Sequence, residues 1–362
     1  ALHGDLVIHG GGDPSLGSAY RCRHTEDFID QIIQRILSNH IKSIKGRIVV
    51  DNSLFDEPAI SPKWMVEDIA WDYGTGCHAF SYKDNRIEIN LRYNGKSYDV
   101  TEVNPPNRFV VETNLTKGEK ENITVKCENN RYTISGTIPK RKDRYRLYLS
   151  IARPDSLYEE KFQTAGIEVK NSNLGQLPET TWFHYPSDYL GDIVHSLNVR
   201  SDNLYAESVL RLLSLSDHEK GSAEKGIDII RKYWQNYEAD SLELFMYDGS
   251  GLARNNKVSA KYLNCVLKET ARDSLIGEDF VQTLPLAGKE GSVATFMKHG
   301  ELPGELRLKS GSMSDVHAYA GYYTTPQNRY AIVVMINNYT CTRSQLKQKI
   351  STLLTQVLSK KE

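Results

Sequence analysis

The opening part of this 362-residue chain combines two apolar patterns. A strand-like run covers residues 1–10, and another apolar run covers residues 46–51. Between them, apolar residues recur every three or four positions from residue 26 to residue 41, which predicts an amphipathic helix. A helix between two strands indicates a small α/β unit. The apolar positions of the helix are Phe28, Ile29, Ile32, Ile33, Ile36 and Leu37.

From about residue 86 to residue 151 the pattern changes to strict alternation. Apolar and polar residues alternate in several short runs, as in strands with one buried face, and no helical period occurs. Asn129 and Asn130 stand between two such runs, where a hairpin turn is expected. We therefore predict an antiparallel, β-rich segment. The alternating positions include Ile87, Ile89, Leu91, Ile123, Val125 and Cys127.

After residue 156 the helical period returns, with candidate helices at 157–165, 190–199, 204–213 and 226–237. The last third then alternates in three runs near residues 306–308, 319–321 and 332–336, which predicts strands of one sheet. A final helix follows and is expected to lie on that sheet. Its predicted apolar stripe includes Leu346, Ile350, Leu353 and Val357.

Composition excludes several functional classes. The chain carries 45 basic and 46 acidic residues, a balance that indicates no attraction to nucleic acid or to a membrane surface. No apolar run approaches the roughly 20 residues of a spanning helix. No C-x-x-C or H-E-x-x-H motif occurs, so we expect neither a metal nor another cofactor. The cysteines are widely spaced and odd in number, at Cys22, Cys77, Cys127, Cys265 and Cys341.

The segment Lys309-Ser310-Gly311-Ser312 carries the first candidate chemistry. A lysine on a strand supplies positive charge, and the neighbouring Ser310 hydroxyl can bind a carboxylate. Gly311 leaves room for a substrate to lie against the strand. The backbone N–H of Ser312 can then face a developing oxyanion. The same triplet is also typical of an ordinary strand that ends in a turn.

A second candidate is the triplet Ser201-Asp202-Asn203. Each of these residue types caps helices well, so one interpretation is an N-cap before the helix that starts near Leu204. The functional interpretation uses the same geometry, with Ser201 relaying a proton and Asn203 binding a substrate amide. The segment Asp248–Leu252 has the composition of a turn.

A serine nucleophile activated by a lysine requires both side chains on one helix face, one turn apart. Only Ser222 to Lys225 and Ser344 to Lys347 have the Ser-x-x-Lys spacing. Both pairs follow Ser201 in the chain, and both serines stand where a helix is expected to begin. We interpret Ser222 and Ser344 as helix N-caps.

In order and spacing, several longer segments are similar to the class C penicillin-binding proteins, the type-four D-alanyl-D-alanine carboxypeptidase/endopeptidase family. The matches extend along the whole chain, so chance explains them less readily than it explains a single triplet. The matching segments are Gly4–Leu16, Gly46–Phe55, Ser201–Arg211, Tyr247–Asn256, Leu284–Ser292 and Leu308–Tyr322.

The resemblance implies a mixed α/β fold, a transpeptidase/β-lactamase-like domain with an antiparallel sheet and packed helices, interrupted by a large β-rich insert domain. We expect the insert over 1–155, with its subdomain at about 86–151, and the rest of the catalytic domain over 156–362. The resemblance further implies a serine carboxypeptidase, in some relatives an endopeptidase, that acts on peptidoglycan stem peptides in the periplasm. β-Lactams would be covalent inhibitors.

By the same resemblance, Ser201 and Asn203 form the second active-site motif, and Lys309, Ser310 and Gly311 form the third. Ser310 would hold the terminal carboxylate of the substrate. Asp68 matches an acidic position that contacts the diaminopimelate side chain in some relatives. Its alternative interpretation is a solvated surface pair with the adjacent acidic residue.

The first motif of this family, a Ser-x-x-Lys upstream of Gly4, does not occur in this sequence. We expect it in a preceding part of the protein, together with a signal peptide. Two alternatives belong to other functional classes. A chain without the nucleophile would be a non-catalytic peptidoglycan-binding module or a silent fragment. A β-lactamase would require an additional base that deacylates penicillin.

Overall fold

The computed structural model describes two compact units. The boundary expected at residue 155 falls inside the first unit, which continues to Asp188 and takes in two later segments. The first unit comprises Ala1–Asp188, Glu207–Gly226 and Asp248–Arg254, and the second comprises Tyr189–Ala206, Ile227–Tyr247 and Asn255–Glu362. The described residues are 1–20, 27–56, 58–106, 109–157, 159–169, 181–216, 219–237, 241–297 and 302–360.

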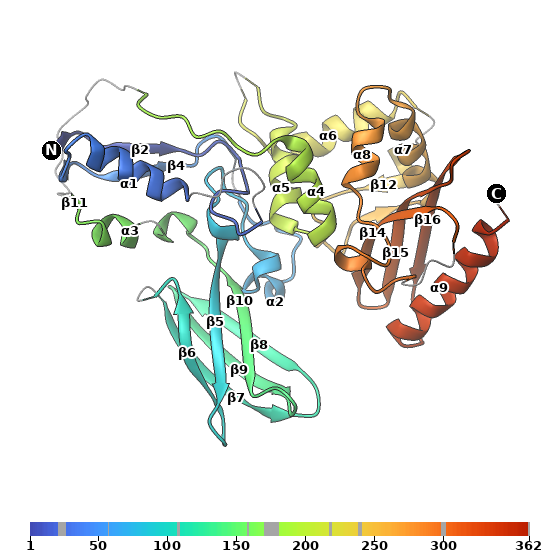
Figure 1. Cartoon of the computed structure of the whole chain (residues 1–362), viewed down its shortest axis with the longest axis horizontal. Coiled ribbons are helices and arrows are strands. Elements are labelled where there is room, and N and C mark those ends of the chain that lie inside the picture. The colour runs from blue at the N-terminus through green and yellow to red at the C-terminus, as the bar shows by residue number, and fades with distance from the viewer. Residues whose placement is uncertain are drawn as a thin grey trace. The chain divides into compact units, whose positions relative to one another are not determined.

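The first unit begins with the predicted α/β arrangement (Figure 1). Strand β2 pairs in parallel with β4, and helix α1 lies between them in the chain. Asp27 caps α1, because its carboxylate accepts a hydrogen bond from the Ile29 backbone N–H at 2.9 Å. Of the predicted apolar stripe, only Leu37 is exposed. The elements are β1 (Leu2–His3), β2 (Leu6–His9), α1 (Phe28–Ser38), β3 (Ser43–Lys45), β4 (Ile48–Asp51), α2 (Val66–Ile69), α3 (Glu159–Thr164) and β11 (Glu168–Val169).

The β-rich segment forms two three-stranded sheets, ordered β10-β5-β6 and β7-β9-β8. Asn129 and Asn130 form the expected tight turn, with φ values of 49° and 63° between β8 and β9. The expectation of a wholly antiparallel segment is wrong, because β7 runs parallel to β9, which lies between β7 and β8. The strands are β5 (Arg86–Tyr93), β6 (Tyr98–Asn104), β7 (Val110–Gly118), β8 (Asn122–Glu128), β9 (Arg131–Pro139) and β10 (Arg144–Ser150).

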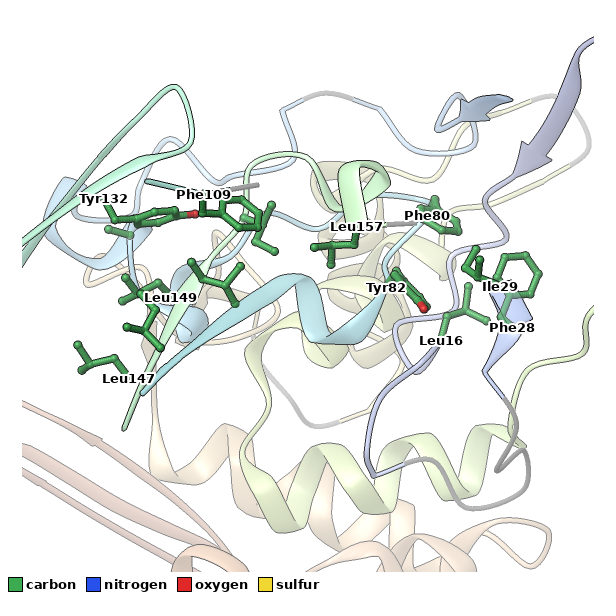
Figure 2. Packing of buried hydrophobic residues seen from close by; sticks show 14 of the residues in the cluster. Leu16, Phe28, Ile29, Phe80, Tyr82, Phe109, Tyr132, Leu147, Leu149 and Leu157 are labelled. Atoms are coloured by element: carbon green, nitrogen blue, oxygen red, sulfur yellow. The ribbon is translucent and has the colours of Figure 1, made fainter. Parts of the chain in front are cut away.

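One apolar core joins the α/β part of the first unit to its β-rich segment. Figure 2 shows Phe80 and Tyr82 close to Phe28 and Ile29 of α1. The inward-facing residues of both small sheets belong to the same buried cluster. These inward positions alternate along each strand, which is why the sequence shows a period of two there. They include Ile87, Ile89, Leu91, Leu115, Tyr132, Ile134, Leu147 and Leu149.

The second unit is built on the antiparallel sheet β14-β15-β16. Helix α9 covers one face, and residues of α7 and α8 form a buried cluster with Tyr322 on the other. The predicted sheet and terminal helix are therefore confirmed. The elements are α4 (Leu190–Arg200), α5 (Asn203–Leu212), α6 (Ala223–Trp234), β12 (Leu244–Phe245), β13 (Lys257–Val258), α7 (Ala260–Arg272), α8 (Gly277–Thr283), β14 (Glu305–Met313), β15 (Val316–Thr324), β16 (Arg329–Asn337) and α9 (Arg343–Leu358). Helices α5 and α6 each have residues in both units.

The buried stripe of α9 differs from the predicted one in its second half. Leu346 and Ile350 are buried as expected, but Leu353 is 53% exposed and Leu354 is buried. The stripe advances by four residues at each step and includes Leu358 rather than Val357. Two adjacent leucines gave the sequence pattern two possible continuations, and packing against the sheet selected one of them.

No described helix combines the length and the apolar character that crossing a membrane requires.

We expect Leu354→Ala to lower the free energy of unfolding by about 2–5 kcal/mol, because it opens a cavity between α9 and the sheet. Leu353→Ala, a control on the same helix, should change it by no more than about 0.5 kcal/mol. Urea denaturation followed by circular dichroism measures both changes. Equal losses would contradict the packing of α9 described above.

Candidate active site

Ser201 lies in a tight turn between two helices. It is the C-cap of α4 and adopts the left-handed conformation, with φ 58° and ψ 50°. Asp202 then caps α5, because its Oδ1 accepts a hydrogen bond from the Tyr205 backbone N–H at 3.2 Å. A non-glycine residue in this conformation costs about 1–2 kcal/mol, so surrounding contacts must hold it. The same turn therefore caps helix α5 through Asp202 and leaves the Ser201 side chain exposed.

An ion pair secures this turn. Arg200 Nη2 lies 2.5 Å from Asp202 Oδ2, and the two side chains are only 17% and 15% exposed. The Arg200 guanidinium also lies over the Tyr205 ring, 5.2 Å from its centroid. Asn203 is the first residue of α5 and is partly exposed. The predicted second motif is therefore a corner held by side-chain contacts, with Ser201 at its apex.

Lys309 of β14 links this corner to the predicted third motif. Its Nζ donates hydrogen bonds to Ser201 Oγ and to the Ser310 carbonyl oxygen, both at 2.7 Å. Burial lowers the pKa of Lys309 to about 8. No carboxylate in the described part of the chain pairs with this ammonium, so desolvation is uncompensated by an opposite charge. Lys309 is consequently a cation that can release its proton near physiological pH.

Ser310 Oγ donates a hydrogen bond to Ser292 Oγ at 2.8 Å. Ser292 is not among the predicted site residues, although it ends the matching segment Leu284–Ser292. A lone serine in a loop has no distinctive pattern, and its proximity to Ser310 arises only from folding. The structure therefore adds a second hydroxyl to the predicted site.

Gly311 and Ser312 continue β14 beside these hydroxyls. A Cβ atom added to Gly311 would meet no atom within 4 Å, so packing within the chain does not require glycine here. The loop before β14 pairs with its free edge only as far as Leu308, whose N–H donates to the Pro285 carbonyl at 3.0 Å. From Lys309 to Met313 this edge has no backbone partner in the described residues. An extended peptide can therefore add to the edge at Gly311.

His317 lies opposite Ser312 in the β14–β15 pairing. Its side chain is buried, and neither ring nitrogen has a hydrogen-bond partner among the described residues. Burial, with the nearby positive charges of Lys347 and Arg343, lowers the pKa of His317. The imidazole is therefore neutral at physiological pH and adds no charge behind the strand.

Asp68 belongs to the first unit, whereas the other predicted site residues belong to the second. It lies on α2 and accepts a hydrogen bond from the Tyr73 hydroxyl at 3.0 Å. Its neighbour Glu67 does not share this environment, since it is exposed and pairs with Arg254 Nη2 at 3.1 Å. Asp68 and Glu67 thus differ in their partners, and the role of Asp68 stays a prediction.

The predicted turn at Asp248–Leu252 is present and is stabilised by two buried carboxylates. Asp248 accepts hydrogen bonds from the Gly251 and Ala253 backbone N–H groups and from Trp64 Nε1. Glu207 Oε1 accepts from the Gly249 and Ser250 N–H groups, each at 2.9 Å. Burial and the charge of Asp248 raise the pKa of Glu207. Sequence reasoning missed Glu207, because a glutamate inside a helix is usually solvated.

The two Ser-x-x-Lys pairs do not form a nucleophile site within the described structure. Lys225 Nζ pairs with Glu219 at 3.1 Å rather than with Ser222, the residue that immediately precedes α6. Ser344 is exposed in the first turn of α9, and its predicted capping role is wrong. Thr342 caps that helix instead, in a capping box with Gln345.

Among the described residues, no group of three or more histidine, cysteine, aspartate or glutamate side chains could hold a metal ion.

The model of the D-Ala-D-Ala carboxypeptidase 3 (S13) family matches residues 1–359. D-alanyl-D-alanine carboxypeptidase DacB of Haemophilus influenzae is 23% identical, over 98% of this chain and 76% of that protein. D-alanyl-D-alanine carboxypeptidase of Actinomadura sp. is 22% identical, over 92% of this chain and 66% of that protein.

Solved structures show the same fold. The crystal structure of penicillin-binding protein 4 (dacB) from Haemophilus influenzae matches with a TM-score of 0.77 and 22% identity, over 98% of this chain and 82% of that one. A second structure of that protein, in complex with a β-lactam, matches with a TM-score of 0.71 and 21% identity over the same shares. The mixed α/β fold with a β-rich segment, as predicted, is therefore the fold of penicillin-binding protein 4.

We expect Lys309→Met to raise the stability of the fold at neutral pH, because it removes a buried charge that lacks a carboxylate partner. Between about pH 8 and pH 10.5 the unfolded lysine keeps its proton while the folded one loses it, so wild-type stability rises with pH. The difference between variant and wild type should therefore shrink over this range. Chemical denaturation at several pH values measures it.

The control is Lys349→Met, which removes an exposed lysine of α9. A Lys309→Met difference that stays constant up to pH 10.5 would show that Lys309 is not desolvated in the folded chain.

Proposed function

The chain belongs to the D-Ala-D-Ala carboxypeptidase 3 (S13) family, a family of serine-type peptidases, and from this premise we propose what the complete protein does. It is a D-Ala-D-Ala carboxypeptidase that cleaves peptidoglycan stem peptides through an acyl-serine intermediate. One observation carries the proposal: Lys309 Nζ joins Ser201 Oγ at 2.7 Å, so two motifs that are distant in sequence form one site.

The substrate carboxylate binds at Lys309 and Ser310 in this proposal. The ammonium of Lys309 supplies positive charge, and the Ser310 hydroxyl donates a charge-assisted hydrogen bond. The peptide lies along the edge of β14 that has no backbone partner among the described residues, where Gly311 leaves space for it. This placement requires a free terminal carboxylate, which matches cleavage of the last residue of a peptide.

Ser201 and Lys309 handle the proton. The nucleophilic serine gives its hydroxyl proton to the lysine of its own motif and attacks the carbonyl carbon of the penultimate D-alanine. The bond from that carbon to the nitrogen of the last D-alanine then breaks, and the leaving amine gains a proton from Ser201. Ser201 regains one from Lys309, which its lowered pKa of about 8 permits near neutral pH; Lys309 takes up a proton from solvent, and the motif lysine releases one. Asn203 holds the substrate amide, and the N–H of Ser312 faces the oxyanion. Water then hydrolyses the acyl-serine.

The nucleophile itself comes from a Ser-x-x-Lys motif that is not in this sequence. Within the printed chain this spacing occurs only at Ser222 and Ser344, and neither serine is bonded to its lysine in the described structure. We place the motif in a preceding part of the protein. Residues 1–155 then correspond to an insert in the catalytic domain, and the compartment is the periplasm. Endopeptidase cleavage of cross-linked stem peptides uses the same chemistry.

Intact mass spectrometry of the complete gene product with benzylpenicillin tests the proposal. We expect a covalent adduct on a serine upstream of Ala1. Lys309→Met should slow its formation by roughly a hundredfold, because carboxylate binding and proton transfer are both lost. Ser344→Ala, on the exposed face of α9, serves as the control. No adduct on a folded, complete protein would reject the peptidase and favour a binding module. A deacylation rate matching that of acylation would instead indicate a β-lactamase.

Asp68 offers a test of substrate selectivity. If its carboxylate binds the free amine of a diaminopimelate side chain, Asp68→Asn should lower kcat/KM for such peptides by roughly tenfold. The loss on acetylated D-Ala-D-Ala peptides without that amine should be small. Glu67→Gln, which neutralises the adjacent exposed carboxylate, should affect both substrates equally. The same loss for Asp68→Asn on both peptides would exclude it from recognition.

A further inference from the structure

The hydroxyl of Ser292 is 2.8 Å from that of Ser310 and lies on a separate loop. In the resting site Ser310 donates its only hydroxyl proton to Ser292, so that proton does not point toward a ligand. When a carboxylate arrives, Ser310 must turn its proton toward it. Ser310 Oγ then has a free lone pair, and Ser292 is in position to donate to it.

The loop that carries Ser292 is held on both sides. Ala287 N–H donates to the Leu306 carbonyl at 2.8 Å, and Gly288 N–H donates to the Val293 carbonyl at 3.0 Å, so the loop is closed beside β14. Gly291 has φ 50°, and a Cβ atom there would lie 2.0 Å from the Val199 carbonyl oxygen of α4. Only glycine permits this approach. The loop is therefore clamped between β14 and the last turn of α4.

These backbone contacts position Ser292 without involving its hydroxyl. Val293 is fully buried and anchors the loop in the core between the sheet and α9, whereas Ser292 is exposed. The fold does not need the hydroxyl for packing, and its one hydrogen bond in the described structure goes to Ser310. An exposed hydroxyl with a fixed position and a single partner points to a role that involves that partner.

We propose that Ser292 is a positioning residue that acts through Ser310 on the substrate carboxylate. With ligand bound, the chain of donors runs from the Ser292 hydroxyl to Ser310 Oγ and from the Ser310 hydroxyl to the carboxylate. Each hydrogen bond in such a chain polarises the next, which strengthens the bond to the anion. The inference rests on the proposed function, because it requires Ser310 to bind a carboxylate.

Ser292→Ala in the complete protein tests this role. We expect the second-order rate constant for acylation by benzylpenicillin to fall by roughly three- to tenfold, the effect of one modest hydrogen bond. Acylation by benzylpenicillin methyl ester, whose carboxylate is neutralised, should change by less than about twofold. Ser292→Thr keeps the hydroxyl and should restore the rate. Ser344→Ala is the matched serine control on an exposed helix face.

A double-mutant cycle identifies the route of the effect. Ser310→Ala should cost more than Ser292→Ala, and the double variant should be no slower than Ser310→Ala alone. Additive losses, equal losses on the acid and the ester, or no loss on the acid would each overturn the role of Ser292.

A binding measurement separates this inference from the proposed function. Residues 1–362 include both hydroxyls, so calorimetry with N-acetyl-D-alanine measures carboxylate binding without any catalytic step. A lower affinity for Ser292→Ala, restored by Ser292→Thr, would support the inference even if the complete protein formed no penicillin adduct. Equal affinity of wild type and Ser292→Ala, or no binding by wild type, would overturn it.

Discussion

The hydrogen bond between Lys309 Nζ and Ser201 Oγ is the contact on which the site depends. It joins β14 to the corner between α4 and α5, two elements separated by about a hundred residues of sequence. The corner holds Ser201 in a left-handed conformation, and burial of Lys309 lowers its pKa to about 8. Both conditions are unfavourable for the fold, and the lowered pKa of Lys309 suits the proton transfer proposed above. Their coexistence at one contact is typical of a site under functional selection.

Close side-chain and backbone contacts surround this hydrogen bond. The Arg200–Asp202 ion pair holds the corner, and the Gly291 loop lies directly against α4. The sheet β14-β15-β16 is covered by α9 on one face and packs with α7 and α8 on the other, so β14 lies in a packed layer. The polar groups of the site are therefore positioned by apolar packing, backbone contacts and the Arg200–Asp202 ion pair. Such preorganisation reduces the reorganisation needed when a substrate binds.

In the first unit, buried carboxylates hold the loops in place. Glu207 and Asp248 are buried carboxylates that accept hydrogen bonds from backbone N–H groups of one turn. Arg211 Nη1 pairs with Glu207 Oε2 at 3.1 Å. Buried charges of this kind add little net stability, but losing one partner is costly. The turn at Asp248–Leu252 and the Trp64 segment, which leads to α2 and Asp68, are thereby tied together. Because of the hydrogen bond from Trp64 to Asp248, the conformation of each of these two segments depends on that of the other.

The sequence by itself determined the elements and the chemical types. Periodicity located α1, the alternating strands and the terminal helix, because side-chain burial repeats with the geometry of each element. The sequence motifs also selected Ser201, Lys309 and Ser310, which the structure joins through hydrogen bonds from Lys309 to the other two; their catalytic roles stay predictions. The sequence pattern did not predict which of the two adjacent leucines of α9, Leu353 or Leu354, is buried, because both are equally apolar. It also did not predict that β7 pairs in parallel with β9, because alternation within a strand does not determine which strand lies beside it.

Only the tertiary structure decided how the motifs meet. The distance from Lys309 to Ser201 and the hydroxyl of Ser292 beside Ser310 depend on contacts between residues without a characteristic spacing. A hydrogen bond requires placement within a few tenths of an ångström, and that precision comes from the packed core and from close backbone approaches such as that of Gly291 to Val199. Local sequence patterns carry no information about distances of that kind.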